Sequence, residues 1–144
     1  MHAKKVIVPV DFSHTDDTTL EYAASLAKEK NGQLMVVHVQ EVPRAYGGEM
    51  YYGIPEPSVD ELSDMLRDVK PSDTAIPVQY TLLSGDPAYA IVQFAKDEGA
   101  DLIVISSHGR TGFLRALMGS VAEAIVRKAH CPVLVCKPGQ IAAV

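Results

Sequence analysis

The sequence is poor in the residues that mark secreted, redox-active or membrane-spanning chains, and it contains no tryptophan. Its two cysteines, Cys131 and Cys136, do not have the Cys-x-x-Cys spacing of redox and zinc motifs, so we interpret them as core thiols. No apolar run approaches the roughly 20 residues that a membrane span needs, and the run after residues 1–5 is too short for a signal peptide. We therefore expect a cytoplasmic protein with no membrane partner.

Positive charge is also scarce. The sequence has 13 Lys and Arg residues and 18 Asp and Glu residues. The resulting net charge of −5 argues against a general surface for nucleic acid or anionic lipid. The charge is uneven, because residues 101–144 hold five basic and two acidic residues while the rest of the chain is strongly acidic. The basic part contains a glycine-punctuated loop over residues 106–120.

Patterns of enzyme catalysis are missing as well. The sequence has no paired-carboxylate constellation and no Gly-x-Ser-x-Gly elbow, and its five histidines show no metal-ligand spacing. His108 has no visible nucleophile or orienting partner near it. Neither Gly-x-Gly-x-x-Gly nor Gly-x-x-x-x-Gly-Lys-Ser/Thr occurs. We therefore assign no catalytic residue and no direct metal ligand, and we leave open whether the protein is an enzyme.

What the sequence does contain is a regular alternation of strand-like and helix-like segments. Strands are predicted over Lys4–Val10, Gln33–Gln40, Ile76–Leu83, Asp101–Ser106 and Pro132–Lys137. Helices are predicted over Ser13–Lys30, Ser58–Val69, Asp86–Glu98 and Ser120–Ala129. This series predicts one α/β domain over residues 1–144, with a doubly wound, Rossmann-like, five-stranded parallel sheet and four main helices. Pro77 and an alternating polar pattern place the third strand at an edge.

Local signals mark the helix ends and the buried helix faces. A capping box is predicted at Ser13–Asp16, and the pair Asp86–Pro87 predicts the start of the third helix. Gly32 and Gly99 are expected to end the first and third helices. The i, i+3, i+4, i+7 spacing predicts the buried positions Leu20, Ala23, Ala24, Ala27, Ala88, Ile91, Val92 and Ala95.

The most informative segment is the loop from Ser106 to Ser120. The strand-like run Leu102–Ile105 precedes it, and Ser120 with Glu123 forms a predicted capping box at the start of the last helix. A helix N-terminus presents free N–H groups and the positive end of the helix dipole, and upstream glycines let the backbone approach an anion closely. The segment therefore predicts a phosphate site, where the Ser120 hydroxyl caps the helix and a backbone N–H meets the phosphate.

The spacing of this loop resembles the C-terminal signature of the universal stress protein family. Two residues separate Ser106 from Gly109, nine separate Gly109 from Gly119, and Ser120 follows directly, whereas the family usually has glycine at the position of Ser106. The resemblance covers nearly the whole chain and implies the strand order 3-2-1-4-5. The other matching segments are Val6–Ser13, Val37–Val39, Gly85–Pro87 and Cys131–Val135.

The resemblance implies an adenine-nucleotide site. In the implied order the first and fourth strands are neighbours, so Asp11 and Ser106–Gly109 converge on one crevice at the topological switch point. The implied cofactors are ATP, or ADP or AMP, and Mg²⁺, which comes with the nucleotide; Asp11 is expected to accept a hydrogen bond from a ribose hydroxyl or from a water bound to Mg²⁺. The implied nucleotide-binding residues are Pro9, Asp11, Val39, Ser106, Ser107, Gly109, Arg110, Thr111, Gly119, Ser120 and Val121.

Simpler interpretations of these residues stay open. Gly109 and Gly119 are also explained by turn geometry alone, since glycine is the common residue at positive φ. An aspartate at position 11 also suits an Asx turn into the first helix, and Arg110 also suits a solvated surface charge.

The function that these features imply is that of an adenine-nucleotide-binding regulator in the stress response, with an unknown partner protein. One alternative is an interaction module that binds no nucleotide, because Ser106 departs from the glycine pattern. Another is a slow ATPase or an autophosphorylating protein that uses Ser107, Thr111 or Ser120, slow because the loop has no lysine.

Two further segments concern partners. Relatives pair their last strand across a two-fold axis, which implies a homodimer through Val133, Leu134 and Val135. Residues 41–57 form the one long irregular segment, which we interpret as a lid, a partner surface or a mobile stretch, and to which we assign no chemistry.

Overall fold

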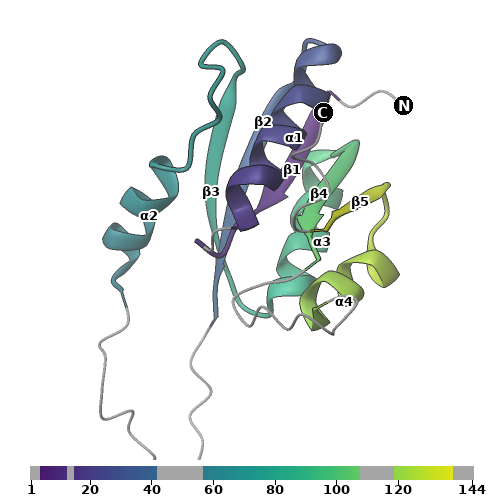
Figure 1. Ribbon diagram of the computed structural model, residues 1–144. Coiled ribbons are helices and arrows are strands. Elements are labelled where there is room, and N and C mark those ends of the chain that lie inside the picture. The colour runs from purple at the N-terminus through teal and green to yellow at the C-terminus, as the bar shows by residue number, and fades with distance from the viewer. Residues whose placement is uncertain (1–3, 13–14, 42–56, 108–118, 138–144) are drawn as a thin grey trace, which may run out of the picture.

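The computed structural model describes residues 4–12, 15–41, 57–107 and 119–137. Within them, a parallel sheet has the order β3-β2-β1-β4-β5, the order that the family resemblance implies, and helices connect the strands (Figure 1). The strands are β1 (Lys5–Pro9), β2 (Gln33–Gln40), β3 (Val78–Ser84), β4 (Leu102–Ser106) and β5 (Val133–Cys136). The helices are α1 (Thr15–Glu29), α2 (Val59–Arg67), α3 (Pro87–Glu98) and α4 (Ser120–Lys128).

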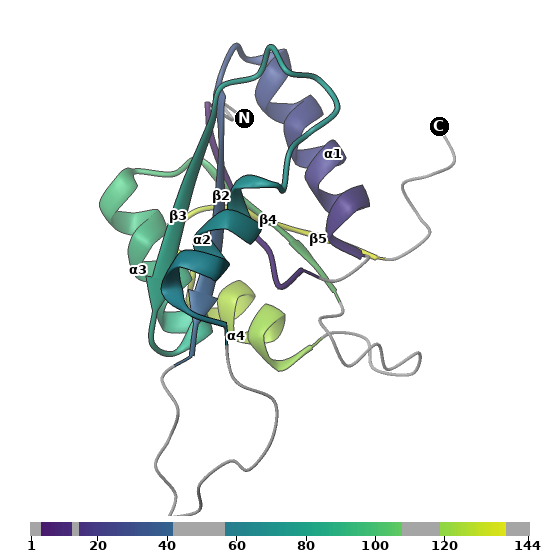
Figure 2. The ribbon, with the colours of Figure 1, turned by 90° about the vertical axis from the view of Figure 1, so that its left-hand side faces the viewer.

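The sheet separates two apolar cores. Alternate residues of each inner strand face opposite sides, so Val6 and Val8 pack with α1 while Ile7 packs with α3 and α4. Figure 2 shows α1 and α3 on opposite sides of the sheet. The predicted face positions of both helices are all buried: Leu20, Ala23, Ala24 and Ala27 of α1, and Ala88, Ile91, Val92 and Ala95 of α3. The inner strands are covered on both sides, which explains their continuous apolar sequence.

The third helix begins where the sequence places it, and the third strand begins two residues later than predicted. Asp86 is the N-cap of α3, where its carboxylate accepts a hydrogen bond of 3.0 Å from the Tyr89 N–H, and Gly99 ends the helix in the left-handed region at φ 63°. β3 lies at the edge, as predicted, but begins at Val78 because Pro77 has no N–H to donate.

The start of α4 corrects one prediction. Ser120 is the first helical residue, and the N-cap is Gly119, at φ −69° and ψ 160°, so the predicted Ser120 cap is wrong. The Gly119 N–H donates to the Ser107 carbonyl at 2.7 Å and the Gly119 carbonyl accepts from the Glu123 N–H at 2.9 Å. These two bonds hold Gly119 extended, and the helix therefore starts after it.

The end of α1 also differs in detail. The left-handed residue is Asn31, at φ 52°, while Gly32 follows it and donates to the Ala27 carbonyl at 2.8 Å. Gly32 is required for another reason, because a Cβ there would overlap the backbone of Lys4. The predicted capping box at Ser13–Asp16 lies outside the side chains that the structure describes. None of the described helices combines the length and the apolar character that crossing a membrane requires.

Candidate functional site

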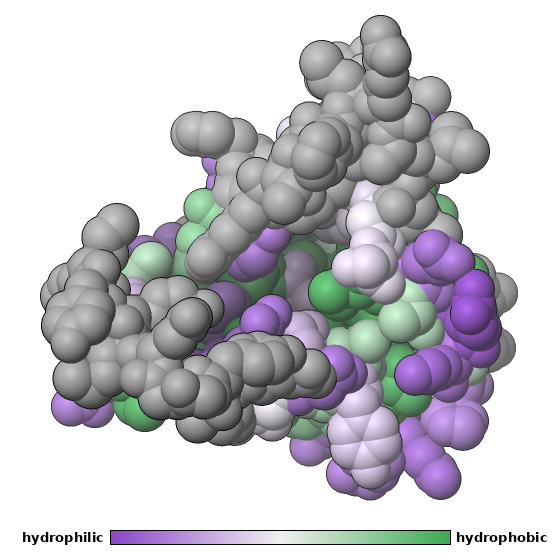
Figure 3. Space-filling view, turned by 90° about the horizontal axis from the view of Figure 1, so that it is seen from below, coloured by the Kyte–Doolittle hydropathy of each residue, from purple (hydrophilic) through white to green (hydrophobic). Residues whose placement is uncertain are grey.

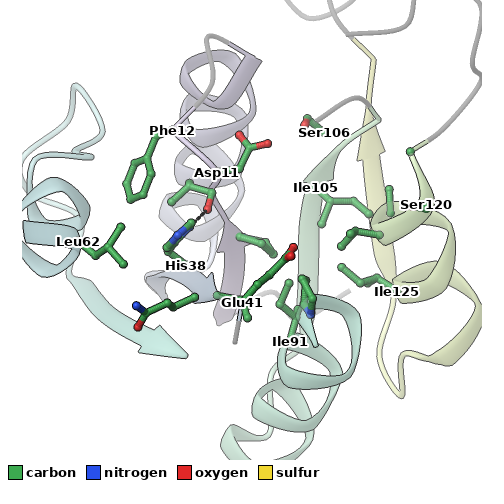
Figure 4. A pocket seen from close by; sticks show the side chains of 18 of the residues that line it. Asp11, Phe12, His38, Glu41, Leu62, Ile91, Ile105, Ser106, Ser120 and Ile125 are labelled. Carbon is green, nitrogen blue, oxygen red and sulfur yellow. Dashed lines mark hydrogen bonds between the residues drawn. The ribbon is translucent and has the colours of Figure 1, made fainter. Parts of the chain in front are cut away.

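A cleft of about 580 Å³ opens at the carboxyl ends of the strands. The ends of β1, β2 and β4, and the first turns of α3 and α4, form its walls, and α2 contributes one side (Figure 4). Figure 3 looks at the molecule from this end and shows apolar side chains inside the hollow. The position agrees with the rule that open α/β sheets bind ligands outside the strand ends at the switch point, here between β1 and β4.

One wall is the turn that leaves β1. The Val10 N–H donates to the Val37 carbonyl at 2.8 Å, and the Val10 carbonyl is 2.7 Å from Nδ1 of His38. Asp11 follows, half-buried, and Phe12 has a φ of 65°. A left-handed conformation is uncommon for a bulky residue, and such strain concentrates at functional sites.

The opposite wall is the junction of β4 and α4. Ser107 is fully buried, its N–H donates to the Cys136 carbonyl at 2.8 Å, and its carbonyl accepts from Gly119. Its Oγ is also buried and has no hydrogen-bond partner among the described residues. An unpartnered buried hydroxyl costs about 1–3 kcal/mol of stability, so its presence on a cleft wall calls for an explanation.

The N-terminus of α4 is open toward the cleft. The first helical bond is donated by Glu123, which leaves the N–H groups of Ser120, Val121 and Ala122 without intrahelical acceptors, and no described side chain caps the helix. Gly119 lies in a region that any residue can adopt, so turn geometry does not require glycine there. The helix dipole favours an anion at these N–H groups, and a glycine before them adds no side chain of its own.

The remainder of the cleft is mainly apolar. Leu62 and Met65 of α2 lie on one side of the sheet end, and Ile91 of α3 and Ile125 of α4 lie on the other. Phe12 packs on the His38 ring with centroids 4.5 Å apart and an interplanar angle of 43°. An apolar cavity with a polar end suits a ligand that has a flat hydrophobic part and an anionic part.

The structure brings most of the predicted site residues together. Those that line the cleft are Pro9, Asp11, Val39, Ser106, Ser107, Gly119, Ser120 and Val121. Gly109, Arg110 and Thr111 lie outside the described residues, as do residues 42–56 of the irregular segment. The sequence analysis missed His38, Phe12 and the apolar residues of α2. The polar His38 near the end of an apolar strand was the available signal.

The two cysteines are not among the residues that line the cleft. Neither forms a disulfide, and burial raises the pKa of both thiols, with the nearby charge of Asp101 adding to the effect at Cys131. A raised pKa keeps a thiol protonated and unreactive, which supports the interpretation as core thiols. Among the described residues, no cluster of three His, Cys, Asp or Glu side chains could hold a metal ion.

Comparisons with known proteins agree on one family. The sequence model described as the universal stress protein family matches residues 2–137. Universal stress protein MJ0531 of Methanocaldococcus jannaschii is 34% identical over 145 residues, which cover 93% of this chain and 82% of that protein. The solved structure of protein MJ0577 of the same organism is 28% identical, with a TM-score of 0.72, and the match covers 95% of this chain and 97% of that one.

A third relative was solved with a ligand. The universal stress protein from Archaeoglobus fulgidus in complex with dAMP is 25% identical to this chain, with a TM-score of 0.65. The match covers 94% of this chain and 98% of the other.

Proposed function

Since this chain belongs to the universal stress protein family, we propose that it binds an adenine nucleotide, ATP or ADP or AMP, in the cleft and acts as a nucleotide-responsive regulator. The observation that carries the proposal is the buried Ser107 hydroxyl, which has no partner among the described residues, beside the open N-terminus of α4. Both features leave hydrogen-bonding capacity unused within the described part of the chain, and a phosphorylated ligand would supply the missing partners. The relative solved with dAMP supports adenine as the base.

We propose that each wall of the cleft binds one part of the nucleotide. The phosphates belong at the N-terminus of α4, and Gly109, Arg110 and Thr111 are further proposed contacts. The ribose belongs between Asp11 and Ser106, which end neighbouring strands, and the base belongs against Pro9 and Val39. Mg²⁺ would neutralise the phosphates, and the Asp11 carboxylate fits its preference for oxygen ligands.

The regulatory part of the proposal is a population shift. A ligand that binds one conformation better than another moves the equilibrium toward it. The cleft is formed by residues from β1, β2, β4, α2, α3 and α4, so bound nucleotide favours the arrangement in which these elements come together around it. A partner protein that contacts any of their outer surfaces would then bind differently with and without nucleotide.

We also propose that residues 1–144 form one domain that pairs as a homodimer through β5. Val133, Leu134 and Val135 are only half-buried, and β5 is an edge strand that pairs with β4 alone among the described strands. An apolar edge strand is a template for pairing with a second chain. Leu134→Asp should therefore produce monomers in analytical ultracentrifugation, and an unchanged sedimentation coefficient would move the interface elsewhere.

A calorimetric titration of nucleotide-free protein with MgATP tests the site. We expect saturable binding of about one nucleotide per chain, and thermal stabilisation that follows from linkage. Gly119→Val should weaken binding at least about tenfold, because it places a branched side chain next to the free N–H groups. Val126→Ala, an exposed change on α4 outside the cleft, is the matched control.

Two outcomes would contradict the proposal. Equal affinity of the wild type and Gly119→Val for MgATP would contradict the assignment of the phosphates to the N-terminus of α4. No heat and no thermal shift at millimolar MgATP would leave the interaction module as the function, with Ser106 as the departure that explains it.

A further inference from the structure

We propose that His38 is a positioning residue, which sets the conformation of the turn that carries Asp11 and thereby the affinity of the cleft for nucleotide. The proposal rests on the proposed function of the cleft. It starts from a buried polar side chain in a strand that is otherwise apolar between Leu34 and Val39.

The His38 ring continues the ladder between β1 and β2 beyond the ends of the paired strands. The register of the two strands ends at Pro9 and Val37, and the Val10 N–H makes the last backbone bond, to the Val37 carbonyl. The Val10 carbonyl is then held by Nδ1 of His38 at 2.7 Å, the contact drawn as a dashed line in Figure 4. A carbonyl oxygen only accepts, so Nδ1 is the protonated nitrogen.

This hydrogen bond acts directly on Asp11. The Val10 carbonyl and the Asp11 N–H belong to one planar peptide unit, so a donor that fixes the carbonyl also fixes the orientation of the backbone at Asp11. Asp11 lines the cleft, and Figure 4 shows its carboxylate near the end of β4, which carries Ser106.

Phe12 shows that the turn needs to be held. Its φ of 65° costs about 1–2 kcal/mol in a residue with a Cβ, and surrounding contacts must offset that cost. The His38 ring provides such a contact, because the Phe12 ring packs on it with the two ring centroids 4.5 Å apart. One side chain thus fixes the residue before Asp11 by a hydrogen bond and the residue after it by packing.

The experiment compares MgATP affinity by calorimetry in two variants of His38. His38→Leu replaces the ring by an apolar side chain of similar size that has no donor. We expect the affinity for MgATP to fall by about fivefold or more. His38→Asn places an amide N–H near the position of Nδ1 but lacks the ring that packs on Phe12, so it should retain more affinity than His38→Leu and less than the wild type. Val36→Ala, a buried change in the same strand and on the same core but outside the cleft, controls for lost stability.

A double-mutant cycle separates positioning from a general structural role. If His38 acts through Asp11, His38→Leu should change affinity by less than about twofold once Asp11→Ala has removed the carboxylate. Independent, additive losses in the two variants would overturn the proposal, as would wild-type affinity in His38→Leu. Should His38→Leu not fold, His38→Gln, whose amide sits too far along the side chain, takes its place in the cycle.

A structural readout keeps this proposal separate from the proposed function. Wild-type protein that binds no MgATP overturns nucleotide binding, whereas the amide NMR signals of Asp11 and Phe12 report the turn without any ligand. We expect the Phe12 signal to move in both variants, because both lack the ring that packs on Phe12, and the Asp11 signal to move further in His38→Leu than in His38→Asn, which keeps a donor. Unmoved signals in His38→Leu would overturn the positioning role even if nucleotide binds.

Discussion

The two ends of the sheet differ in how far hydrogen bonds satisfy their polar groups. At the amino end, the Asp101 carboxylate accepts hydrogen bonds from the Lys4 and Lys5 N–H groups at 3.1 and 2.9 Å, and Nζ of Lys5 donates to the Glu98 carbonyl. At the carboxyl end, Ser107 Oγ has no partner in the described part of the chain, and no described side chain caps α4.

The backbone differs in the same sense. At the amino end two segments of the backbone are in close contact, and there is no space for a side chain at Gly32 beside the backbone of Lys4. At the carboxyl end a cleft of about 580 Å³ is open and Phe12 adopts a left-handed conformation. The amino end is thus organised for stability, while the carboxyl end has the strained and unsatisfied groups that are typical of functional sites.

We expect the largest effect from a substitution at the closely packed amino end of the sheet. Gly32→Ala places a Cβ against the backbone of Lys4, where no flexible side chain can move aside, and we expect a loss of about 3 kcal/mol in the free energy of unfolding. Urea unfolding followed by circular dichroism measures it. Gly99→Ala is the control, because its Cβ would meet open space and only the left-handed φ of 63° is strained, at about 1–2 kcal/mol. Equal losses would contradict close packing at Gly32.

A smaller effect is expected from the polar contacts of the same end. Asp101→Ala removes the acceptor of two backbone N–H groups and should cost about 1–2 kcal/mol, while Asp101→Asn keeps one oxygen and should cost less. Because the site is at the opposite end of the sheet, MgATP affinity should not change in either variant. A change in affinity would show that the two ends are coupled, and it would be detected in the same titration.

The smallest effect is expected at the open end, and its sign is reversed. Ser107→Ala removes a buried hydroxyl that has no partner among the residues the structure describes, so the ligand-free protein should unfold at the same temperature or be stabilised by up to about 1 kcal/mol. The thermal shift produced by MgATP should fall at the same time, since the hydroxyl no longer meets the ligand. A clear loss of stability without ligand would mean that the hydroxyl already has a partner within the protein.

The fold was predictable because its signals are local or periodic. The buried faces of α1 and α3, the Asp86 cap and the edge position of β3 all follow from spacing and from the chemistry of single residues. The wrong cap at Ser120 shows the limit of such signals. Ser120 fits a capping box in the sequence, but a hydrogen bond between Gly119 and Ser107, twelve residues earlier, sets where the helix begins.

The candidate site was predictable only in part. The glycine spacing and Asp11 identified both walls of the cleft, because each is carried by residues next to a strand end. His38 and Leu62 were missed, since each looks like an ordinary residue of its own strand or helix. Their place in the cleft depends on how α2 and the end of β2 pack beside the turn after β1.

The sequence by itself determined the strands and helices, the buried faces, the family resemblance and the residues at the ends of β1 and β4. Those features depend on patterns of a few neighbouring residues, which chain chemistry dictates. Only the tertiary structure decided that the His38 ring holds the Val10 carbonyl, that the Ser107 hydroxyl is buried without a partner in the described part of the chain, and that the two ends of the sheet differ. Each of these requires residues far apart in the chain to meet, and no local pattern encodes the distance between them.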